Sequence, residues 1–180
     1  ISRSGLLTIC GGKWTTYRKM AEECIDQAAL VGGLEERESV TPNLQIHGWT
    51  QVPEGADPFK DGAVYGSDWK HIEKLREENP EFAELIHPDL PYTCAEVVWS
   101  VRFEMARRLE DVLSRRTRAL LLNARATIAA APKVADLMAA ELGWDENRKA
   151  DELKAFEAIA KRYVLPQNWK EELDWSLKEL

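Results

Sequence analysis

The sequence has no long apolar run, no excess of positive charge, and no low-complexity tract or internal repeat. No run approaches the roughly 18–20 apolar residues that a membrane-spanning helix needs, and no signal peptide is visible. The net charge of −7 argues against bulk nucleic-acid binding, which favours a basic chain. What the sequence does have is 44% hydrophobic residues and seven tryptophans, which are ample for a packed core.

Cysteine and histidine are scarce, with three of each, and neither type shows the spacing of a metal site. The cysteines are far apart and form no CxxC motif, which is typical of proteins in a reducing compartment. We therefore expect no metal site and no functional disulfide. The residues concerned are Cys10, Cys24, Cys94, His47, His71 and His87.

The most informative stretch lies near the start of the chain. An apolar run over residues 6–10 leads into Gly11-Gly12-Lys13, and the paired threonines Thr15 and Thr16 follow. This order predicts a strand, a tight turn and the start of a helix. Glycines allow positive φ angles and close approach of a ligand, and a first helical turn presents free N–H groups that suit an anionic group. Taken alone, the turn is equally compatible with a plain strand–helix connection that binds nothing.

Helical periodicity dominates the rest of the chain, apart from one stretch. From Trp14 to Val31, apolar side chains recur every three or four positions, which predicts a helix with one buried stripe that stops at Gly32-Gly33. Prolines and glycines punctuate residues 35–66, which we expect to be a linker. The pattern is helical from there almost to the end. The sequence therefore predicts a mainly α fold, in which a short strand–turn–helix segment precedes a C-terminal helical bundle.

Residues that cap helices mark the expected boundaries. Thr93 and Glu96 have the spacing of a capping box, and the helix that they open is expected to run to Val112. Pro132 is expected to kink a later helix or to start a new one. Further caps and stops are expected at Asn123, Gly143, Asp145 and Pro166, and a last helix is expected over residues 169–180.

Two blocks of the sequence resemble one known family. The block SGLLTICGGKWTTYRKMAEECID is similar to the last flavin-contacting segment of FAD-dependent glycerol-3-phosphate dehydrogenases, the respiratory type that reduces quinone. The block EVVWSVRFEMARRLEDVLSRRTRALLLNARATIAAAPKVADLMAAELGWD resembles the C-terminal helical domain of that family. The resemblance implies that residues 1–34 complete an FAD domain and that residues 67–180 form the helical domain. Residues 35–66 are then the linker between the two. The resemblance also implies that the chain is the C-terminal piece of a longer protein.

The resemblance implies flavin contacts at the turn, with no catalytic residue in this chain. The implied contacts are Gly11, Gly12, Lys13, Thr15 and Thr16, and Lys13 is also a candidate for the substrate phosphate or carbonyl oxygen. The chain has no GxGxxG fingerprint and no candidate base. The parent protein would oxidise sn-glycerol 3-phosphate to dihydroxyacetone phosphate and pass electrons to quinone, or to oxygen as in a close sibling. The piece alone is expected to be inactive and to hold FAD weakly.

A series of seven arginines within 24 residues stands out in this acidic chain. One interpretation is a surface for anionic lipid headgroups, centred on Arg115, Arg116 and Arg118, in line with the peripheral membrane attachment of the family. Docking on the absent FAD domain is a second interpretation. Pairing with acidic residues such as Glu96 and Glu104 on helix surfaces is the third and simplest. The full series is Arg102, Arg107, Arg108, Arg115, Arg116, Arg118 and Arg125.

The expected partners of the parent protein follow from the same resemblance. They are glycerol 3-phosphate, quinone and the inner face of the cell membrane, approached from the cytoplasm, with no nucleic acid. Homo-oligomer formation stays open. A competing hypothesis from another class is a non-catalytic helical docking module, whose Gly-Gly-Lys turn merely joins two elements of secondary structure.

Overall fold

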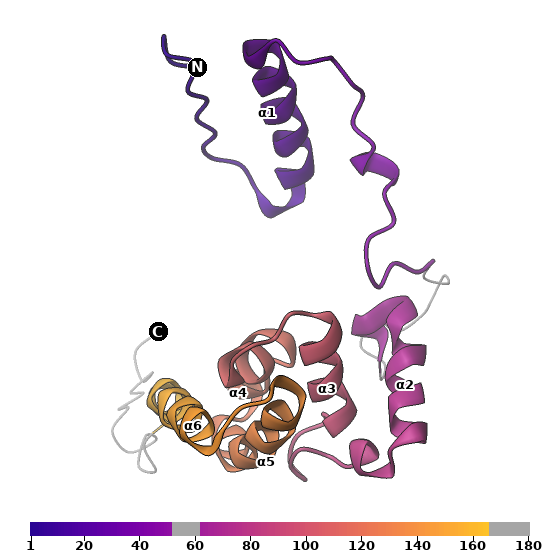
Figure 1. Cartoon of the computed structure of the whole chain (residues 1–180), viewed down its shortest axis with the longest axis vertical. Helices are drawn as coiled ribbons and strands as arrows, with labels where there is room; N and C mark the ends of the chain where they lie inside the picture. Colours follow the sequence, from indigo (N-terminus) through magenta and orange to yellow (C-terminus); the bar gives the residue numbers. More distant parts are fainter. Residues whose placement is uncertain (52–61, 166–180) are drawn as a thin grey trace, which may run out of the picture. The chain divides into compact units, whose positions relative to one another are not determined.

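Helices provide the regular secondary structure of this computed structural model, which describes residues 1–51 and 62–165 (Figure 1). The mainly α class that the sequence predicts is confirmed. The strand expected over residues 6–10 is not formed, since the described backbone pairs in β fashion only at an isolated antiparallel bridge between Leu85 and Thr93. A strand needs a neighbour to bond its N–H and C=O groups, and no described segment pairs with residues 6–10.

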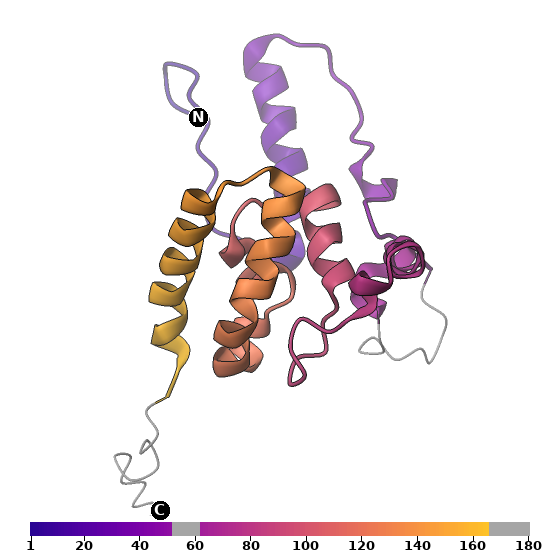
Figure 2. The same ribbon diagram turned by 60° about the horizontal axis from the view of Figure 1, so that its bottom comes forward.

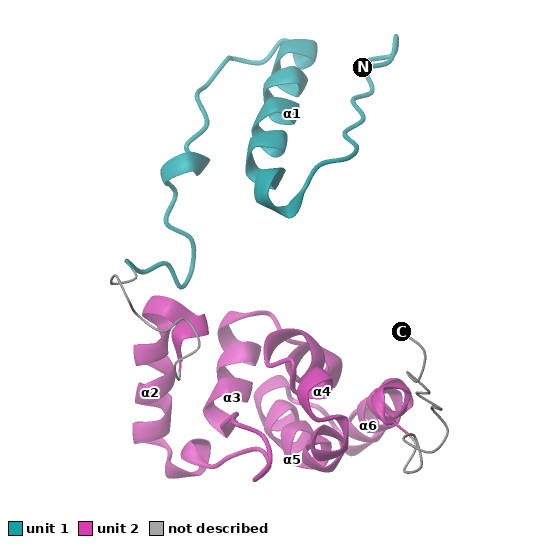
Figure 3. Cartoon of the chain, turned by 180° about the vertical axis from the view of Figure 1, so that it is seen from behind, with its two compact units in different colours: residues 1–56 teal, residues 57–180 magenta. Residues whose placement is uncertain are grey.

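The chain divides into two units, residues 1–56 and residues 57–180 (Figure 3). Unit 1 begins with irregular backbone that leads into a long helix. Its elements are the 3₁₀ helix η1 (Trp14–Thr16), the α-helix α1 (Tyr17–Gly32) and the 3₁₀ helix η2 (Thr41–Asn43). The stop predicted at the end of α1 is confirmed, because Gly33 has a left-handed φ of 63° and donates its N–H to the Leu30 carbonyl at 3.3 Å.

The apolar stripe of α1 is not buried, contrary to the expectation from its sequence. No residue of α1 falls in the buried class. Trp14 is 86% exposed, and Tyr17, whose ring stacks on it at a centroid distance of 5.2 Å, is 59% exposed. An amphipathic helix normally packs its apolar stripe against another element. Within the described part of unit 1, no other element buries this apolar face.

Unit 2 is a bundle of long and short helices. Its elements are η3 (Ala63–Asp68), α2 (Trp69–Glu78), η4 (Pro80–Ala83), α3 (Cys94–Phe103), the π-helix η5 (Asp111–Arg116), α4 (Ala119–Leu122), α5 (Ala124–Leu142), α6 (Glu146–Ala160) and η6 (Lys161–Tyr163). Along the bundle, α2, α3, α5 and α6 follow one another, each in contact with the next (Figures 1 and 2).

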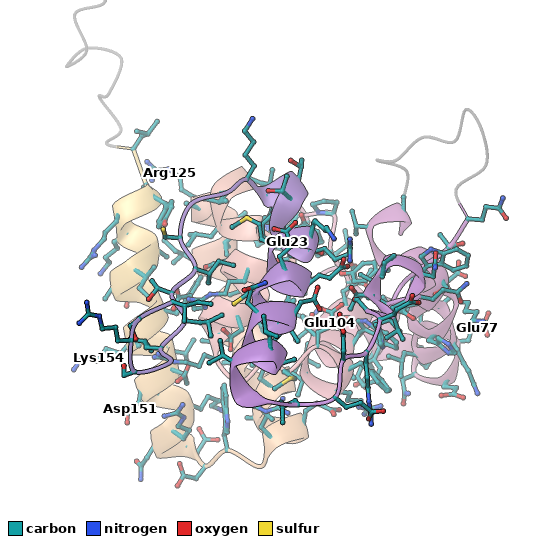
Figure 4. All side chains as sticks on the ribbon, turned by 90° about the horizontal axis from the view of Figure 1, so that it is seen from above. Glu23, Glu77, Glu104, Arg125, Asp151 and Lys154 are labelled. Atoms are coloured by element: carbon teal, nitrogen blue, oxygen red, sulfur yellow. The ribbon has the colours of Figure 1, made fainter. Side chains whose placement is uncertain are left out.

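The core of unit 2 is centred on α3. Every residue from Cys94 to Val101 is buried, because α2 contacts one side of α3 and α5 another. Fully burying one aliphatic side chain contributes roughly 1.5–3 kcal/mol, so this helix supplies much of the stability of the unit. Charged side chains project outward instead, as Glu77 on α2 and Asp151 and Lys154 on α6 show (Figure 4).

The helix that opens at Cys94 is shorter than the sequence predicts. It ends at Phe103 rather than Val112, and the chain reverses through Met105, which has a left-handed φ of 58°. The Ala106 N–H bonds back to the Ser100 carbonyl at 2.9 Å, which closes the reversal. The chain then re-enters the core and buries Val112 in the π-helical turn of η5. The prediction of a continuous helix over residues 94–112 is therefore wrong.

Most of the predicted helix boundaries are confirmed. Asn123 and Asp145 cap α5 and α6, accepting hydrogen bonds from Ala126 N at 3.1 Å and Arg148 N at 2.7 Å. Pro132 neither ends α5 nor starts a new helix, because α5 continues through it. The capping box is formed by Thr93 and Glu96, and α5 stops at Gly143 with a φ of 67°. The predictions at Pro166 and over residues 169–180 lie outside the described residues.

Candidate functional site

The Gly-Gly-Lys turn has a backbone that only glycine adopts easily. Gly11 has a φ of 81° and Gly12 a φ of 101°. A Cβ atom on Gly12 would lie 2.1 Å from the sulfur of Met20, so a side chain at this position would strain the backbone and displace the flexible end of the Met20 side chain. A Cβ on Gly11 would meet nothing within 4 Å. Met20 of α1 therefore fills the space beside Gly12, whereas the space beside Gly11 is open.

Thr16 connects the turn to the start of the helix. Its hydroxyl oxygen accepts the Lys13 backbone N–H at 3.2 Å, and its hydroxyl donates to the Lys13 carbonyl at 3.1 Å. The Thr16 backbone N–H donates to the same carbonyl at 3.0 Å. This arrangement corresponds to one half of a capping box, with Lys13 as N-cap and Thr16 as the third helical residue.

Four backbone donors around the turn remain free. Within the described residues, no hydrogen bond occupies the N–H groups of Gly11, Gly12, Trp14 or Thr15. The last two belong to the first turn of the helix, where unpaired N–H groups and the positive end of the helix dipole coincide. The backbone at this turn is therefore able to donate to an anionic or carbonyl-bearing ligand, as the sequence predicts.

An apolar cavity lies beside these donors. It has a volume of about 540 Å³, and its walls include Ile9, Gly11, Gly12, Trp14, Tyr17 and Met20. A second cavity of about 410 Å³ shares Ile9, Cys10, Met20 and Cys24 with the first. Small-molecule sites commonly combine an apolar wall with a few placed polar groups. The turn and the first turns of α1 meet this description.

Lys13 contributes a positive charge to the rim of the larger cavity. Its side chain is exposed, and its ammonium group forms no ion pair with any residue in the described ranges. By contrast, Lys19 and Arg18 one turn further along both pair with Glu22. Lys13 is therefore the cation of this site that is available to a ligand.

The residues present fit the FAD that the resemblance implies. An isoalloxazine ring has apolar faces and, when reduced, often carries negative charge at its N1–C2=O edge. The apolar wall suits the faces, while free N–H groups and the Lys13 ammonium suit the edge. Gly11 leaves the approach to the backbone open, because no side chain or neighbouring atom fills the space beside it.

The arginine series is largely engaged in structural contacts. Six of its seven members bond through their side chains to carboxylates or to backbone carbonyls, and two of the carboxylates come from helices far along the chain. The partners are Glu141 for Arg102, the Val101 and Ala106 carbonyls for Arg107, Glu152 for Arg108, Glu110 and Asp111 for Arg115, Glu104 for Arg116, and the Leu165 carbonyl for Arg125. Pairing with acidic residues, the simplest interpretation, thus describes most of the series.

The three arginines proposed as an anionic-ligand surface differ from one another. Arg115 pairs with two carboxylates, at 2.8 and 2.9 Å, and Arg116 donates to the Glu104 carbonyl at 2.6 Å. Arg118 is exposed and has a left-handed φ of 57°. Its backbone carbonyl accepts the N–H groups of Leu121 and Leu122, but its guanidinium forms no hydrogen bond or ion pair within residues 1–51 and 62–165. Of the three, Arg118 is the one whose guanidinium is available to a ligand or a surface.

Two buried glutamates organise unit 2, and the sequence predicts the cap that Glu96 forms with Thr93 but neither its bond to Tyr65 nor the role of Glu152. Glu96 accepts hydrogen bonds from the Thr93 N–H and from the Tyr65 hydroxyl, at 2.7 and 3.0 Å, and burial raises the pKa of this carboxyl above its ordinary value. It was expected to pair with arginine, and instead it bonds to these neutral groups. Glu152 is 3% exposed and pairs with Arg108 and Arg148 at 3.3 and 2.7 Å. Both glutamates act in the core rather than at a ligand site.

The described ranges contain no group of three or more histidine, cysteine, aspartate or glutamate residues placed to hold a metal ion. None of the helices in these ranges combines the length and the apolar character required to span a bilayer.

Comparison with known proteins places unit 2 in one family. Residues 62–149 match the model described as the C-terminal domain of alpha-glycerophosphate oxidase. The chain is 35% identical over 173 residues to "Glycerol-3-phosphate dehydrogenase, mitochondrial" of Bos taurus, and 34% identical to the protein of the same name from Homo sapiens. It is 34% identical to "Probable glycerol-3-phosphate dehydrogenase, mitochondrial" of Caenorhabditis elegans. No solved structure matches.

These matches cover 86% of this chain, but only 23% to 24% of each relative. The chain thus spans about a quarter of the length of the curated relatives it matches. Since 86% of the chain is more than unit 2 contains, the similarity extends into unit 1. The chain belongs to the glycerol-3-phosphate dehydrogenase and alpha-glycerophosphate oxidase family, of which it carries the C-terminal part.

Proposed function

We propose that this chain is the C-terminal part of an FAD-dependent glycerol-3-phosphate dehydrogenase, and that its Gly-Gly-Lys turn contacts the flavin. The observation that carries the proposal is the match of relatives with this name to 86% of the chain. The turn adds support, because an apolar cavity, four free backbone donors and an unpaired lysine meet there. The uncovered apolar face of unit 1 is then the surface that packs within the FAD domain.

The proposed reaction oxidises sn-glycerol 3-phosphate to dihydroxyacetone phosphate. A hydride leaves the carbon that bears the secondary hydroxyl, and a proton leaves the hydroxyl itself. FAD supplies the hydride acceptor when bound. The residues of this chain bind and orient: the N–H groups of Gly11 and Gly12 donate to the flavin edge, and Lys13 attracts the substrate phosphate, the carbonyl oxygen of the product, or the flavin edge. The catalytic base belongs to the part of the parent protein outside this chain.

The contribution of the helix terminus to the redox chemistry is bounded. A terminus stabilises a nearby anion by roughly 0.3–1 kcal/mol, and by up to ~2 kcal/mol when partly buried. For a two-electron couple, ~30 mV corresponds to about 1.4 kcal/mol. The turn therefore raises the flavin potential by some tens of millivolts at most. Its main role is to hold the ring, while its effect on the potential is a secondary one.

The rest of the proposal concerns the parent protein. Its electrons pass to quinone, with oxygen as the alternative acceptor, and it attaches peripherally to the inner face of the cell membrane. The helical domain docks on the FAD domain. The 180-residue chain alone is inactive and binds FAD weakly, because the dinucleotide fingerprint and the base lie elsewhere.

The test uses the parent protein with FAD bound and oxygen removed. Adding sn-glycerol 3-phosphate is expected to bleach the visible absorbance of the flavin, and the Lys13→Ala variant is expected to bleach more slowly or to need more substrate. Lys154→Ala, at an exposed position of α6, is the matched control and is expected to behave as the parent. An unbleached parent, or a Lys13→Ala variant identical to it, contradicts the proposal. Reoxidation by quinone compared with reoxidation by oxygen then identifies the acceptor.

A further inference from the structure

The Thr16 side chain is directed to the backbone of Lys13, three residues earlier in the chain. Its hydroxyl accepts from the Lys13 N–H at 3.2 Å and donates to the Lys13 carbonyl at 3.1 Å. The Thr16 backbone N–H reaches the same carbonyl at 3.0 Å. The hydroxyl has one hydrogen, which these contacts use. Thr16 therefore has little hydrogen-bonding capacity left for a ligand, unlike its neighbour Thr15, whose N–H is free in the described chain.

These bonds fix the two peptide planes on either side of Lys13. A trans peptide is planar, so its C=O and N–H point in opposite directions. Holding the Lys13 carbonyl toward Thr16 therefore aims the Trp14 N–H away from Thr16. Holding the Lys13 N–H toward Thr16 likewise aims the Gly12 carbonyl away from it. Thr16, through its hydroxyl and its backbone N–H, thus holds the direction of a free donor in the first helical turn and of a carbonyl in the glycine turn.

Met20 supports the same turn one helical turn further along. Its sulfur occupies the space where a Gly12 Cβ would lie, and it also lies 3.7 Å from the Thr16 hydroxyl oxygen. The hydroxyl has a single hydrogen, so the sulfur is an alternative acceptor to the Lys13 carbonyl. Gly12, Thr16 and Met20 thus form one packed contact beneath the turn, on the wall that Met20 shares with the cavity.

We propose that Thr16 is a positioning residue, which orients the two peptide units on either side of Lys13, and with them the free Trp14 N–H, toward the bound flavin without contacting the flavin itself. This inference rests on the proposed function, because it takes the turn to be the flavin site. It changes the role expected for Thr16 from the sequence, where it was grouped with the cofactor-contacting residues. The hydroxyl, rather than the methyl group, carries the effect.

The experiment compares Thr16→Val with Thr16→Ser in the FAD-loaded parent protein. Valine keeps the shape and loses the hydroxyl, so the FAD dissociation constant is expected to rise roughly fivefold, the effect of losing one ordinary hydrogen bond, and the flavin potential to fall. Serine keeps the hydroxyl and is expected to restore the FAD dissociation constant to within about twofold of the parent and the flavin potential to that of the parent. Thr50→Val, at an exposed position of unit 1, is the matched control and is expected to change neither.

Three outcomes overturn the inference: a Thr16→Val variant with unchanged FAD affinity and potential, a Thr16→Ser variant as impaired as Thr16→Val, or an equal effect in Thr50→Val. A Gly12→Val variant separates this from the proposed function. If Gly12→Val loses FAD while Thr16→Val keeps it, only the positioning role fails. If Gly12→Val also keeps FAD, the turn is not the flavin site and the proposed function fails with it.

Discussion

Tyr65 donates its phenolic hydrogen to the buried carboxylate of Glu96 at 3.0 Å, although 31 positions separate the two residues in the sequence. Tyr65 lies in η3, at the start of the described part of unit 2, and Glu96 lies in the first turn of α3. The bond therefore attaches the segment that enters the helical unit to the centre of its core. Burial and the nearby Glu96 charge raise the pKa of Tyr65, so the phenol stays protonated and remains a donor.

Removing this donor is expected to destabilise the chain. The Tyr65→Phe variant leaves Glu96 with one hydrogen bond fewer in a buried position, which costs about 1–3 kcal/mol. Urea denaturation of the 180-residue chain measures the free energy of unfolding. Tyr163→Phe, at a half-exposed position of η6, is the matched control and is expected to change it by less than about 0.5 kcal/mol. Equal free energies of unfolding for the two variants would show that the bond between Tyr65 and Glu96 does not stabilise the chain.

The same carboxylate gives the stability of the chain a pH dependence. Burial raises the pKa of Glu96 above its ordinary value of 4.5, so between 4.5 and the raised pKa the folded chain keeps a proton that the unfolded chain releases. The contribution of Glu96 to stability is therefore fully present below pH 4.5 and decreases as the pH rises through the raised pKa. Urea denaturation at a series of pH values measures the free energy of unfolding, and its slope against pH is expected to be less negative for Glu96→Gln than for the parent chain. Parallel pH profiles would show that Glu96 does not titrate in this way.

Glu152 is expected to matter more than an exposed glutamate on the same helix. It is 3% exposed, accepts the Leu109 N–H at 3.3 Å, and pairs with Arg108 and Arg148. Both arginines are about half exposed, so water screens part of the attraction, and we expect Glu152→Gln to cost about 1–3 kcal/mol. Glu157→Gln, which breaks only an exposed pair with Lys161, is expected to cost less than about 1 kcal/mol. Thermal and urea unfolding of both variants test the difference.

The arginine surface is tested with lipid vesicles. If Arg115, Arg116 and Arg118 face anionic headgroups in the parent protein, replacing all three by Gln weakens its binding to phosphatidylserine vesicles by about 1 kcal/mol for each arginine that meets the membrane. The loss is expected to shrink as salt rises. The control replaces Lys70, Lys74 and Lys154, which are exposed residues of α2 and α6. A loss of equal size in both triple variants, or no loss in either, assigns the arginines to the carboxylate pairs described above.

Local signals in the sequence were enough to predict most helix boundaries. Asn123, Asp145 and Gly143 cap or stop their helices as expected, because each acts on backbone groups within a few residues of itself. The reversal at Met105 was missed, since the apolar spacing continues through it while the chain turns to bring Val112 into the core. Apolar periodicity indicates which residues are buried, but it does not show where a helix ends when the chain on both sides of that end is buried.

Features that depend on distant parts of the chain could not be predicted. Arg102 and Arg108 find their partners on α5 and α6, at Glu141 and Glu152, rather than among the acidic residues beside them. The contact of Met20 with Gly12 depends on how α1 leaves the turn. In the candidate site, the glycine turn and its free donors were predictable from residue types. The bonds of the Thr16 hydroxyl to the Lys13 backbone could be seen only in the structure.

The FAD content of a Gly12→Val variant of the parent protein measures whether the turn after Cys10 holds a flavin. Valine at this position strains a backbone with a φ of 101° and meets the Met20 side chain, so the purified variant is expected to contain little or no FAD. Gly33→Ala, which also strains a left-handed glycine but lies beyond the far end of α1, is expected to keep its FAD. A Gly12→Val variant that is purified with a full complement of FAD would contradict the account.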